Sequence, residues 1–234
     1  MPSLAHRDRQ PELMDDPALD PAEHRRALAG LARINRWSGS ANLLWPPIRE
    51  YARRLNRPLR LLDVATGSGD VPLALLNLAR RDGITLEVTG CDLSPLAIDE
   101  ARARVTALNV PATFLVADVL ADPLPGRFDV VTCSLFLHHL DERDVVVVLR
   151  RMADAGTLVL VSDLVRNRFN LMQVWVASRL FTRSRVVHVD GPLSIRGAFT
   201  VNELLQLAEQ AGLSGATAQL KFPCRMLLSW RHPA

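Results

Sequence analysis

Short apolar runs alternate with helical patterns along most of the chain. The apolar runs predict five strands, over residues 59–65, 86–91, 113–117, 128–133 and 157–162. Helical patterns fall between several of them, over residues 72–81, after Ser94-Pro95 and over residues 141–152. Strands joined by helices favour a parallel, doubly wound sheet, since parallel strands require crossover connections.

The C-terminal part of the chain predicts one more helix and two more strands. A capping box at Thr200–Glu203 begins a helix that ends near Gly212. Apolar runs over residues 216–221 and 225–230 are separated by only three residues, which predicts an antiparallel hairpin. The fold class expected is therefore α/β, Rossmann-like, with a mostly parallel seven-stranded sheet that ends in this hairpin.

Two segments fall outside this alternation. Residues 1–20 are polar and Pro-rich, which predicts an extended or loosely ordered arm, and helical patterns follow from Pro21 and over residues 42–55. Residues 164–199 carry an apolar, arginine-flanked stretch. We interpret residues 1–58 as an arm with lid helices and residues 59–234 as the core. Within that core, residues 164–199 are predicted to be a helical insertion that completes the lid.

Composition narrows the function classes. The chain has 234 residues, enough for one domain with a full core or a core with a small cap. Hydrophobic content of 48% and charged content of 23% are ordinary for a soluble globular protein. The net charge is only +3, aromatic residues are 5%, and no long run of like charges occurs, so nucleic-acid binding is disfavoured.

The cysteines and the N-terminal residues bear on location. Cys91, Cys133 and Cys224 show no C-x-x-C spacing, which favours free thiols in a reducing compartment. The first ten residues carry charges where a signal peptide needs an apolar core. No stretch reaches the ~18 uninterrupted apolar residues of a membrane span. We therefore expect a cytoplasmic protein.

Candidate chemistry follows the carboxyl ends of the predicted strands, where open parallel sheets bind ligands. The first strand ends in Asp63 and a Gly67-Ser68-Gly69 turn, whose glycines allow a ligand close to the backbone. An acid in this turn argues against a phosphate and for hydroxyls or a positive charge. Asp92 after the second strand suits a ribose diol, and Asp118 after the third could accept from the amine of adenine.

Four motifs in this order resemble the class I S-adenosylmethionine-dependent methyltransferases: residues 63–69, 90–95, 116–119 and 128–131. Within them, the chain most resembles the ubiquinone/menaquinone-biosynthesis type and related small-molecule O-methyltransferases. The resemblance spans residues 59–163 and implies S-adenosylmethionine as cofactor and S-adenosylhomocysteine as product. The cofactor-binding residues that it implies are Asp63, Ala65, Thr66, Gly67, Gly69, Asp92, Leu93, Ala117, Asp118, Val119 and Ser134.

One departure and one competing family bear on the resemblance. The family usually has a Pro-Gly-Gly turn before its fifth strand, where this chain has residues 152–156, so the geometry of that turn is in doubt. A dinucleotide-dependent dehydrogenase is the main enzymatic competitor. It would have a third glycine where Pro72 stands, and its turn would have no need of Asp63.

A histidine after the fourth strand and an aspartate at the end of the fifth are candidates for general acid–base catalysis. His138 follows the fourth strand and Asp163 ends the fifth, so an imidazole base and its orienting carboxylate could converge. His139 and His188 are the alternates, and a histidine that only starts a helix and packs remains open. No metal is expected, because a catechol-type site would need acids where Ser134 stands.

The insertion is the candidate acceptor pocket, although a core-facing amphipathic helix would give the same pattern. Its apolar residues are Phe169, Leu171, Met172, Val174, Trp175, Val176, Leu180 and Phe181. They favour a small hydrophobic acceptor such as a phenol, quinol or polyketide. Flanking arginines would also suit peripheral membrane contact; these are Arg166, Arg168, Arg179, Arg183 and Arg185. In the N-terminal stretch, Arg33, Asn35 and Trp37 are candidates to cover the cofactor.

The type of methylation is left partly open. Residues 11–15 and 32–38 resemble bacterial methyltransferases associated with type III polyketide synthases, which favours O-methylation of a lipophilic phenol. C-methylation of a quinol-type or polyketide acceptor is one alternative. A catalytically silent cofactor-binding subunit is another, and the oligomeric state is not predicted.

Overall fold

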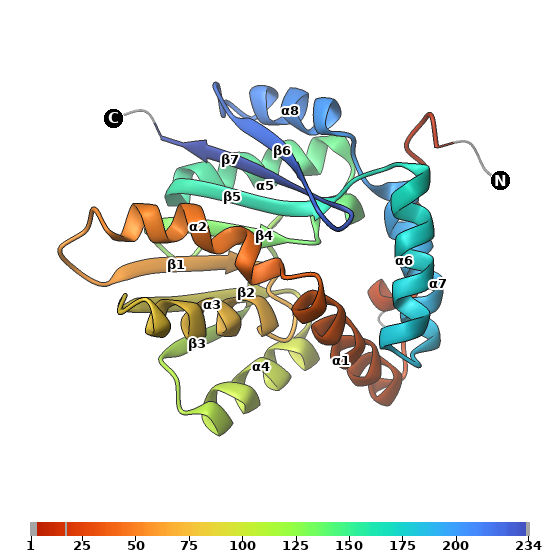
Figure 1. The fold of residues 1–234 in the computed structure, drawn as a ribbon, viewed down its shortest axis with the longest axis horizontal. Helices are drawn as coiled ribbons and strands as arrows, with labels where there is room; N and C mark the ends of the chain where they lie inside the picture. Colours follow the sequence, from red (N-terminus) through yellow and green to blue (C-terminus); the bar gives the residue numbers. More distant parts are fainter. Residues whose placement is uncertain (1–3, 17, 233–234) are drawn as a thin grey trace.

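A computed structural model describes residues 4–16 and 18–232 of the chain. In this part, seven strands form one sheet in the order β3-β2-β1-β4-β5-β7-β6 (Figure 1). The first five strands are parallel, whereas β7 is antiparallel to both β5 and β6. The strands are β1 (Leu59–Val64), β2 (Leu86–Asp92), β3 (Ala112–Val116), β4 (Phe128–Ser134), β5 (Gly156–Leu164), β6 (Thr217–Lys221) and β7 (Arg225–Arg231). The predicted mixed sheet with its C-terminal hairpin is confirmed.

Helices cover both faces of the sheet. On one face, α2 (Ser40–Ala52), α3 (Asp70–Arg81) and α4 (Pro95–Leu108) share a buried core with the sheet. On the other face lie α5 (Glu142–Ala155) and α8 (Val201–Gln210) (Figure 1). A three-layer arrangement of this kind leaves only the strand ends free for a ligand site.

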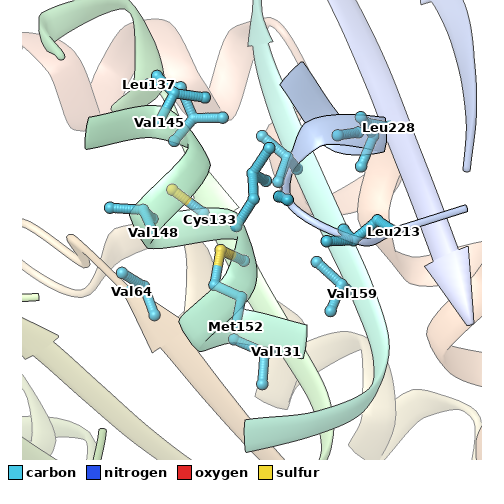
Figure 2. Packing of buried hydrophobic residues seen from close by; sticks show 14 of the residues in the cluster. Val64, Val131, Cys133, Leu137, Val145, Val148, Met152, Val159, Leu213 and Leu228 are labelled. Atoms are coloured by element: carbon cyan, nitrogen blue, oxygen red, sulfur yellow. The ribbon is translucent and has the colours of Figure 1, made fainter. Parts of the chain in front are cut away.

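The apolar runs in the central strands are explained by burial on both faces. In β5, Leu158 and Leu160 belong to the core under α2 and α3, whereas Val159 and Val161 belong to the core under α5 and α8. Figure 2 shows Val159 and Val131 on the second side, packed with Met152 of α5. A central strand of this sheet therefore has no face that is exposed to solvent, as is usual in parallel sheets.

Three helices gather at the carboxyl end of the parallel strands, away from the two main layers (Figure 1). They are α1 (Pro21–Trp37), α6 (Arg168–Phe181) and α7 (Arg185–Gly197), and they pack against one another. The second N-terminal helix does not join them, because Leu44 and Ile48 of α2 are fully buried against the sheet. The expectation that both N-terminal helices form a lid is therefore wrong for α2.

The N-terminal arm is held by side chains rather than loosely ordered. Arg7 donates to the carbonyl oxygens of Gly197 (2.6 Å), Leu140 (2.6 Å) and His138 (3.0 Å). A short 3-10 helix, η1 (Leu13–Asp15), follows, and the Leu13 and Met14 N–H groups donate to Asp190 of α7. The sequence-based expectation is wrong for this part of the arm, while residues 1–3 and 17 lie outside the described residues.

The Pro-Gly-Gly turn that the family usually has before its fifth strand has no counterpart in this chain. Helix α5 continues to Ala155 and β5 begins at the next residue, Gly156. A Cβ on Gly156 would lie 2.5 Å from Cγ2 of Val131, so only glycine allows this direct join beside β4. The other predicted element boundaries differ from the observed ones by at most three residues. In the described part of the chain, no helix is long and apolar enough to cross a membrane.

Candidate active site

A cavity of about 1240 Å³ lies between the carboxyl ends of the parallel strands and helices α1, α6 and α7. This volume exceeds the ~300–1,000 Å³ that is typical of a single small-molecule pocket. One wall consists of the loops after β1, β2, β3 and β4, and the opposite wall consists of the three helices and η1. The cavity is therefore large enough for a nucleoside-sized ligand beside a second small molecule.

The two glycines of the turn after β1 have different roles. Both adopt left-handed backbone angles, with φ of 55° at Gly67 and 72° at Gly69. A Cβ on Gly67 would meet no atom within 4 Å, and this residue lines the cavity. A Cβ on Gly69 would lie 2.8 Å from Phe114, and Gly69 does not line the cavity. The prediction that Gly69 approaches the ligand is therefore wrong, because its missing side chain makes room for Phe114.

Asp63 is a buried acid at the base of this turn. The hydroxyl of Thr66 donates to its Oδ2 (2.7 Å) and the hydroxyl of Thr132 donates to its Oδ1 (2.6 Å). Burial raises the pKa of Asp63 to about 7, although these two hydrogen bonds act in the opposite direction. The carboxyl group is thus close to half-protonated at neutral pH, and a nearby positive charge would favour its ionised form.

Asp92 connects the end of β2 to the turn. Its Oδ2 accepts from the N–H of Gly67 (2.8 Å) and its Oδ1 accepts from the N–H of Ser94 (2.9 Å). Burial raises the pKa of Asp92, and these backbone hydrogen bonds partly offset the rise. Each oxygen keeps a second lone pair, so the carboxylate can accept from two hydroxyls without releasing the loop.

The remaining predicted cofactor residues lie along the same wall. Those that line the cavity beside Asp63, Gly67 and Asp92 are Ala65, Thr66, Leu93, Ala117, Asp118, Val119 and Ser134. Asp118 accepts from the N–H of Leu120 (2.8 Å), which fixes its carboxylate at the cavity edge. The buried hydroxyl of Ser134 has no hydrogen-bond partner within residues 4–16 and 18–232, which leaves one polar group on this wall available to a ligand.

The structure brings His138 and Asp163 into direct contact. His138 lies in a 3-10 turn, η2 (Leu137–His139), and its Nδ1 is 2.6 Å from Oδ1 of Asp163 at the end of β5. Burial alone would raise the pKa of Asp163, but the charge and hydrogen bond of His138 lower it below the ordinary value. An ionised Asp163 accepts from Nδ1 of His138, and Nε2 is the ring nitrogen that is left for another contact. His138 lines the cavity, while Asp163 lies behind it.

The alternate histidines lie in different surroundings. Nδ1 of His139 is 3.0 Å from Oδ2 of Asp15. Burial lowers the pKa of His139, but Asp15 and Glu12 more than offset this effect and raise it to about 9. His139 is therefore an imidazolium at neutral pH and a poor base. His188 donates through Nε2 to the carbonyl of Thr182 and does not line the cavity, so the structure argues against it as a base.

Glu12 of the arm is a site residue that sequence reasoning missed. Its Oε1 is 3.9 Å from Nε2 of His138, and its Oε2 is 3.9 Å from Nε2 of His139. The ligand atoms of these three residues lie within 4.8 Å of one another, a spacing that a divalent cation could use. The imidazolium of His139 already balances one carboxylate there. The absence of a metal stays a prediction, which turnover after dialysis against a chelator would test.

Helix α1 covers part of the cavity through Asn35 and Trp37, as expected, but not through Arg33. Arg33 instead donates to the carbonyl of Phe181 (2.8 Å) on α6. Asn35 donates to Asp70 (3.0 Å), the first residue of α3 and another cavity residue that was not predicted. Helix α1 is thereby hydrogen-bonded both to α6 and to the first residue of α3, which directly follows the glycine turn.

Helix α6 uses only some of its apolar residues for the cavity. Of the apolar insertion residues predicted from the sequence, those that line the cavity are Phe169, Met172, Val174, Val176, Leu180 and Phe181. Trp175 does not line it, since half of the side chain is exposed and the Arg179 guanidinium lies 4.1 Å from its ring centroid. Leu171 also lies outside the lining and packs with Leu164 and Ile195. The predicted apolar wall is therefore real, but without these two residues.

Comparison with known proteins identifies the family. Residues 61–156 match the methyltransferase domain family. Over 203 residues the chain is 30% identical to a ubiquinone biosynthesis O-methyltransferase of Thiobacillus denitrificans, which covers 78% of this chain and 82% of that protein. The chain belongs to the class I S-adenosylmethionine-dependent methyltransferases. It is an enzyme with S-adenosylmethionine as its cofactor.

Other proteins match this methyltransferase over a shorter stretch or at lower identity. A demethylmenaquinone methyltransferase of Thermus thermophilus is 40% identical over 107 residues, which is 44% of this chain and about half (47%) of that protein. An O-methyltransferase from neocarzinostatin biosynthesis has a TM-score of 0.66 at 22% identity, and covers 95% of this chain and 62% of that one. Magnesium protoporphyrin IX methyltransferase from Synechocystis PCC 6803 has a TM-score of 0.60 at 15% identity, over 92% and 100%. These two structures share the fold.

The wall after β1, β2 and β4 fits this cofactor on its own geometry. Gly67 leaves room for a ligand beside the backbone, Asp92 keeps lone pairs for a diol, and the Ser134 hydroxyl is unpartnered in the described part of the chain. The apolar wall on α6 lies across the cavity from these groups. The wall that fits the cofactor and the apolar wall of α6 are thus different parts of one cavity.

The raised pKa of Asp63 predicts a pH-dependent effect of the Asp63→Asn substitution. Between its ordinary value of 3.8 and about 7, the folded enzyme holds a proton that the unfolded chain has released. The free energy of unfolding therefore falls as pH rises through this window, and the whole of that loss persists at higher pH. We expect the ligand-free Asp63→Asn enzyme to melt at a higher temperature than the wild type at pH 8. Thermal melts at pH 5 and pH 8 check this.

The same substitution should lower the preference for the cationic cofactor. At pH 8 an ionised Asp63 favours the sulfonium of S-adenosylmethionine over neutral S-adenosylhomocysteine, and asparagine removes this distinction. Calorimetric titration of both ligands gives the affinity ratio. A melting difference that is as large at pH 5 as at pH 8 would show that the pKa of Asp63 is not raised.

Proposed function

We propose that this methyltransferase transfers a methyl group to a hydroxyl oxygen of a small hydrophobic, aromatic acceptor, with His138 as the general base. The observation that carries the proposal is the His138–Asp163 pair (2.6 Å), because it occupies Nδ1 and leaves Nε2 as the second ring nitrogen of a residue that lines the cavity. His138 lines the same cavity as the residues of the cofactor wall and the apolar residues of α6. A hydroxyl held there could lose its proton to Nε2 as its oxygen is methylated.

The chemistry asks little of the protein beyond placement and proton transfer. When bound, S-adenosylmethionine supplies a methyl group on a sulfonium sulfur, which leaves as a neutral thioether. The cavity walls align the acceptor oxygen, and alignment of this kind is worth ~7–11 kcal/mol. Nε2 of His138 takes the hydroxyl proton, and ionised Asp163 stabilises the imidazolium that forms. The Asp163 hydrogen bonds to the backbone N–H groups of His138 and Leu164 keep that carboxylate fixed.

The acceptor wall supports a hydrophobic aromatic molecule. Its apolar residues on α6 are Phe169, Met172, Val176, Leu180 and Phe181, and Gln173 and Ser178 are polar residues of the same helix that also line the cavity. The Thiobacillus relative is named as a ubiquinone biosynthesis O-methyltransferase, and the neocarzinostatin enzyme was solved with 1,4-dihydroxy-2-naphthoic acid. Both names fit the proposal of a hydroxylated aromatic acceptor.

The exposed part of α6 suggests where a lipophilic acceptor enters. Phe169 and Leu180 line the cavity and are also 59% and 73% exposed. Arg179 lies on the same helix, so this face combines apolar and basic groups as peripheral membrane helices do. Shallow membrane contact therefore stays part of the proposal, and co-sedimentation with anionic vesicles would test it.

Methylation at carbon of a quinol-type acceptor is the second candidate. It is favoured by the 40% identity to a demethylmenaquinone methyltransferase over 107 residues. The same base could remove a ring proton, so the geometry of His138 does not exclude this chemistry. The two candidates differ in the position of the new methyl group.

The experiment is turnover with S-adenosylmethionine carrying a ¹³C-methyl group, on a panel of alkylated phenols and hydroquinones. We expect methyl ethers, recognised by the carbon chemical shift of the new methyl group. The matched controls are the same rings with each hydroxyl already methylated, which should give no product. Ring-methylated products from the phenols would favour the second candidate. Acceptance of the blocked controls would contradict both the O-methylation and the need for a base.

A further inference from the structure

A buried arginine lies at the edge of the cavity without a direct ion pair in the described part of the chain. Arg225 begins β7, is 3% exposed and lines the cavity. Its Nη2 lies 3.1 Å from three neutral oxygens, Oδ1 of Asn35 and the hydroxyls of Ser38 and Ser40. Its Nη1 has no hydrogen-bond partner. Within residues 4–16 and 18–232, no carboxylate lies within ion-pair distance of this guanidinium.

A second buried arginine shows what the fold does when an arginine is only structural. Arg166 is 5% exposed, and its guanidinium binds both carboxylate oxygens of Glu203, at 2.6 and 2.9 Å. A buried charge without such a partner is costly to the folded state. Burial lowers the pKa of Arg225 to about 10, which still leaves it protonated at neutral pH. Arg225 therefore carries a full charge without a direct ion pair in the described part of the chain, and Asp163 and Asp70 favour that charge only from beyond ion-pair distance.

Asn35 connects this arginine to an acid on the other side of the cavity edge. Its Oδ1 accepts from Arg225 (3.1 Å) and its Nδ2 donates to Oδ2 of Asp70 (3.0 Å). Asp70 is the first residue of α3, directly after the glycine turn, and burial raises its pKa. One amide thus holds a cation and an anion apart at the end of the cavity that is next to Gly67. A ligand end that carries both a carboxylate and an ammonium complements this pair.

We propose that Arg225 binds the α-carboxylate of S-adenosylmethionine, with Asn35 as the positioning residue that fixes the guanidinium relative to Asp70. The inference rests on the family's cofactor and is independent of the role proposed for His138. An oxyanion at this place takes over the hydrogen bonds that the hydroxyls of Ser38 and Ser40 now accept. The carboxylate of an acidic acceptor has the same chemistry, but the link through Asn35 and Asp70 to the turn favours the cofactor.

The test compares ligands that differ in the carboxylate alone. Calorimetric titrations use S-adenosylhomocysteine and its decarboxylated analogue, which keeps the amine, with the wild type and with Arg225→Met. We expect the substitution to weaken S-adenosylhomocysteine by about 30-fold or more, as for loss of one partner from a buried charge pair. The decarboxylated analogue should change by less than about 3-fold. Arg225→Lys keeps a cation without the planar fork and should give an intermediate loss.

Thermal melts of the ligand-free proteins supply a second readout. Arg225→Met should melt at the same temperature as the wild type or higher, because an unpaired buried charge is removed. The matched control, Arg166→Met, should melt lower because it leaves Glu203 without its partner, and it should not change the ratio of the two ligand affinities.

Two results would overturn the proposal. One is an equal loss of affinity for both ligands in Arg225→Met and in Arg225→Lys, which would show a structural role. The other is unchanged affinity for S-adenosylhomocysteine together with weaker binding of salicylate, a simple aromatic carboxylate probe. That outcome would assign Arg225 to an acidic acceptor. Neither result depends on turnover, so both are distinguishable from a failure of the His138 proposal.

Discussion

Replacing His138 with asparagine is expected to lower kcat on a phenolic acceptor by about 10²- to 10⁴-fold, the usual worth of a positioned general base. Asparagine can still donate from its side-chain amide to Asp163, which is 2.6 Å from Nδ1 of the native imidazole. The buried carboxylate therefore keeps a partner and the fold should be retained. What asparagine lacks is a basic nitrogen in the position of Nε2. Steady-state turnover with saturating cofactor measures the loss.

The acidity of the acceptor separates a base from a merely positioning residue. A nitrophenol that is already ionised at the assay pH needs no base, so His138→Asn should lose much less activity on it than on an alkylphenol. His139→Asn is the matched control, because His139 is an imidazolium paired with Asp15 and should tolerate the change within about 5-fold. An equal loss on acidic and weakly acidic phenols would rule out His138 as the base.

Replacing Asp92 with alanine should weaken S-adenosylhomocysteine binding by about 100-fold or more. The carboxylate is predicted to accept from the two ribose hydroxyls, and hydrogen bonds to a charged group are worth ~1.5–3 kcal/mol each. The substitution also leaves the N–H groups of Gly67 and Ser94 without their acceptor. Calorimetric titration of the variant gives the change in affinity directly.

A ligand without the ribose hydroxyls distinguishes these two effects of Asp92→Ala. The 2′,3′-dideoxy analogue should bind wild type and variant within a few-fold of each other if ribose recognition dominates. Asp99→Ala is the matched control, since Asp99 is an exposed acid on α4 that pairs with Arg102 at 3.7 Å. It should leave both affinities unchanged. If the analogue loses as much affinity as the parent ligand, Asp92 serves only to hold the turn.

The sheet and the cofactor wall could be predicted because each depends on a short, continuous stretch of sequence. A strand buried on both faces needs an unbroken apolar run, and the residues at its end fall at a fixed place beside the cavity. For this reason Asp63, Gly67 and Asp92 were placed from spacing alone, and the structure shows each of them in the cavity wall. Gly69 was misassigned, because the contact that requires it comes from Phe114, forty-five residues away along the chain.

The other wall depends on contacts between distant segments, which no local pattern contains. Glu12 reaches His138 only because Arg7 binds the carbonyls around η2 and Asp190 holds η1. The sequence does not distinguish Arg225 from the many other arginines of the chain; only its hydrogen bond to Asn35, which is distant in sequence, does so. Helix α2 has an apolar face like that of a lid helix, and only packing shows which surface it covers. For Trp175, helical periodicity gave the right helix but not the direction of the side chain.

The division of the cavity into two walls affects how such an enzyme can change its substrate over evolutionary time. The cofactor wall is formed by loops that leave strands locked into the sheet, so most substitutions there also disturb the core. The facing wall is formed by α1, α6 and α7, which pack mainly on one another. A mutation such as Phe169 or Met172 to a smaller residue reshapes that wall without reaching the sheet. Acceptor preference can therefore drift while methyl-donor affinity is conserved, which lets one ancestral catalyst give rise to many specificities.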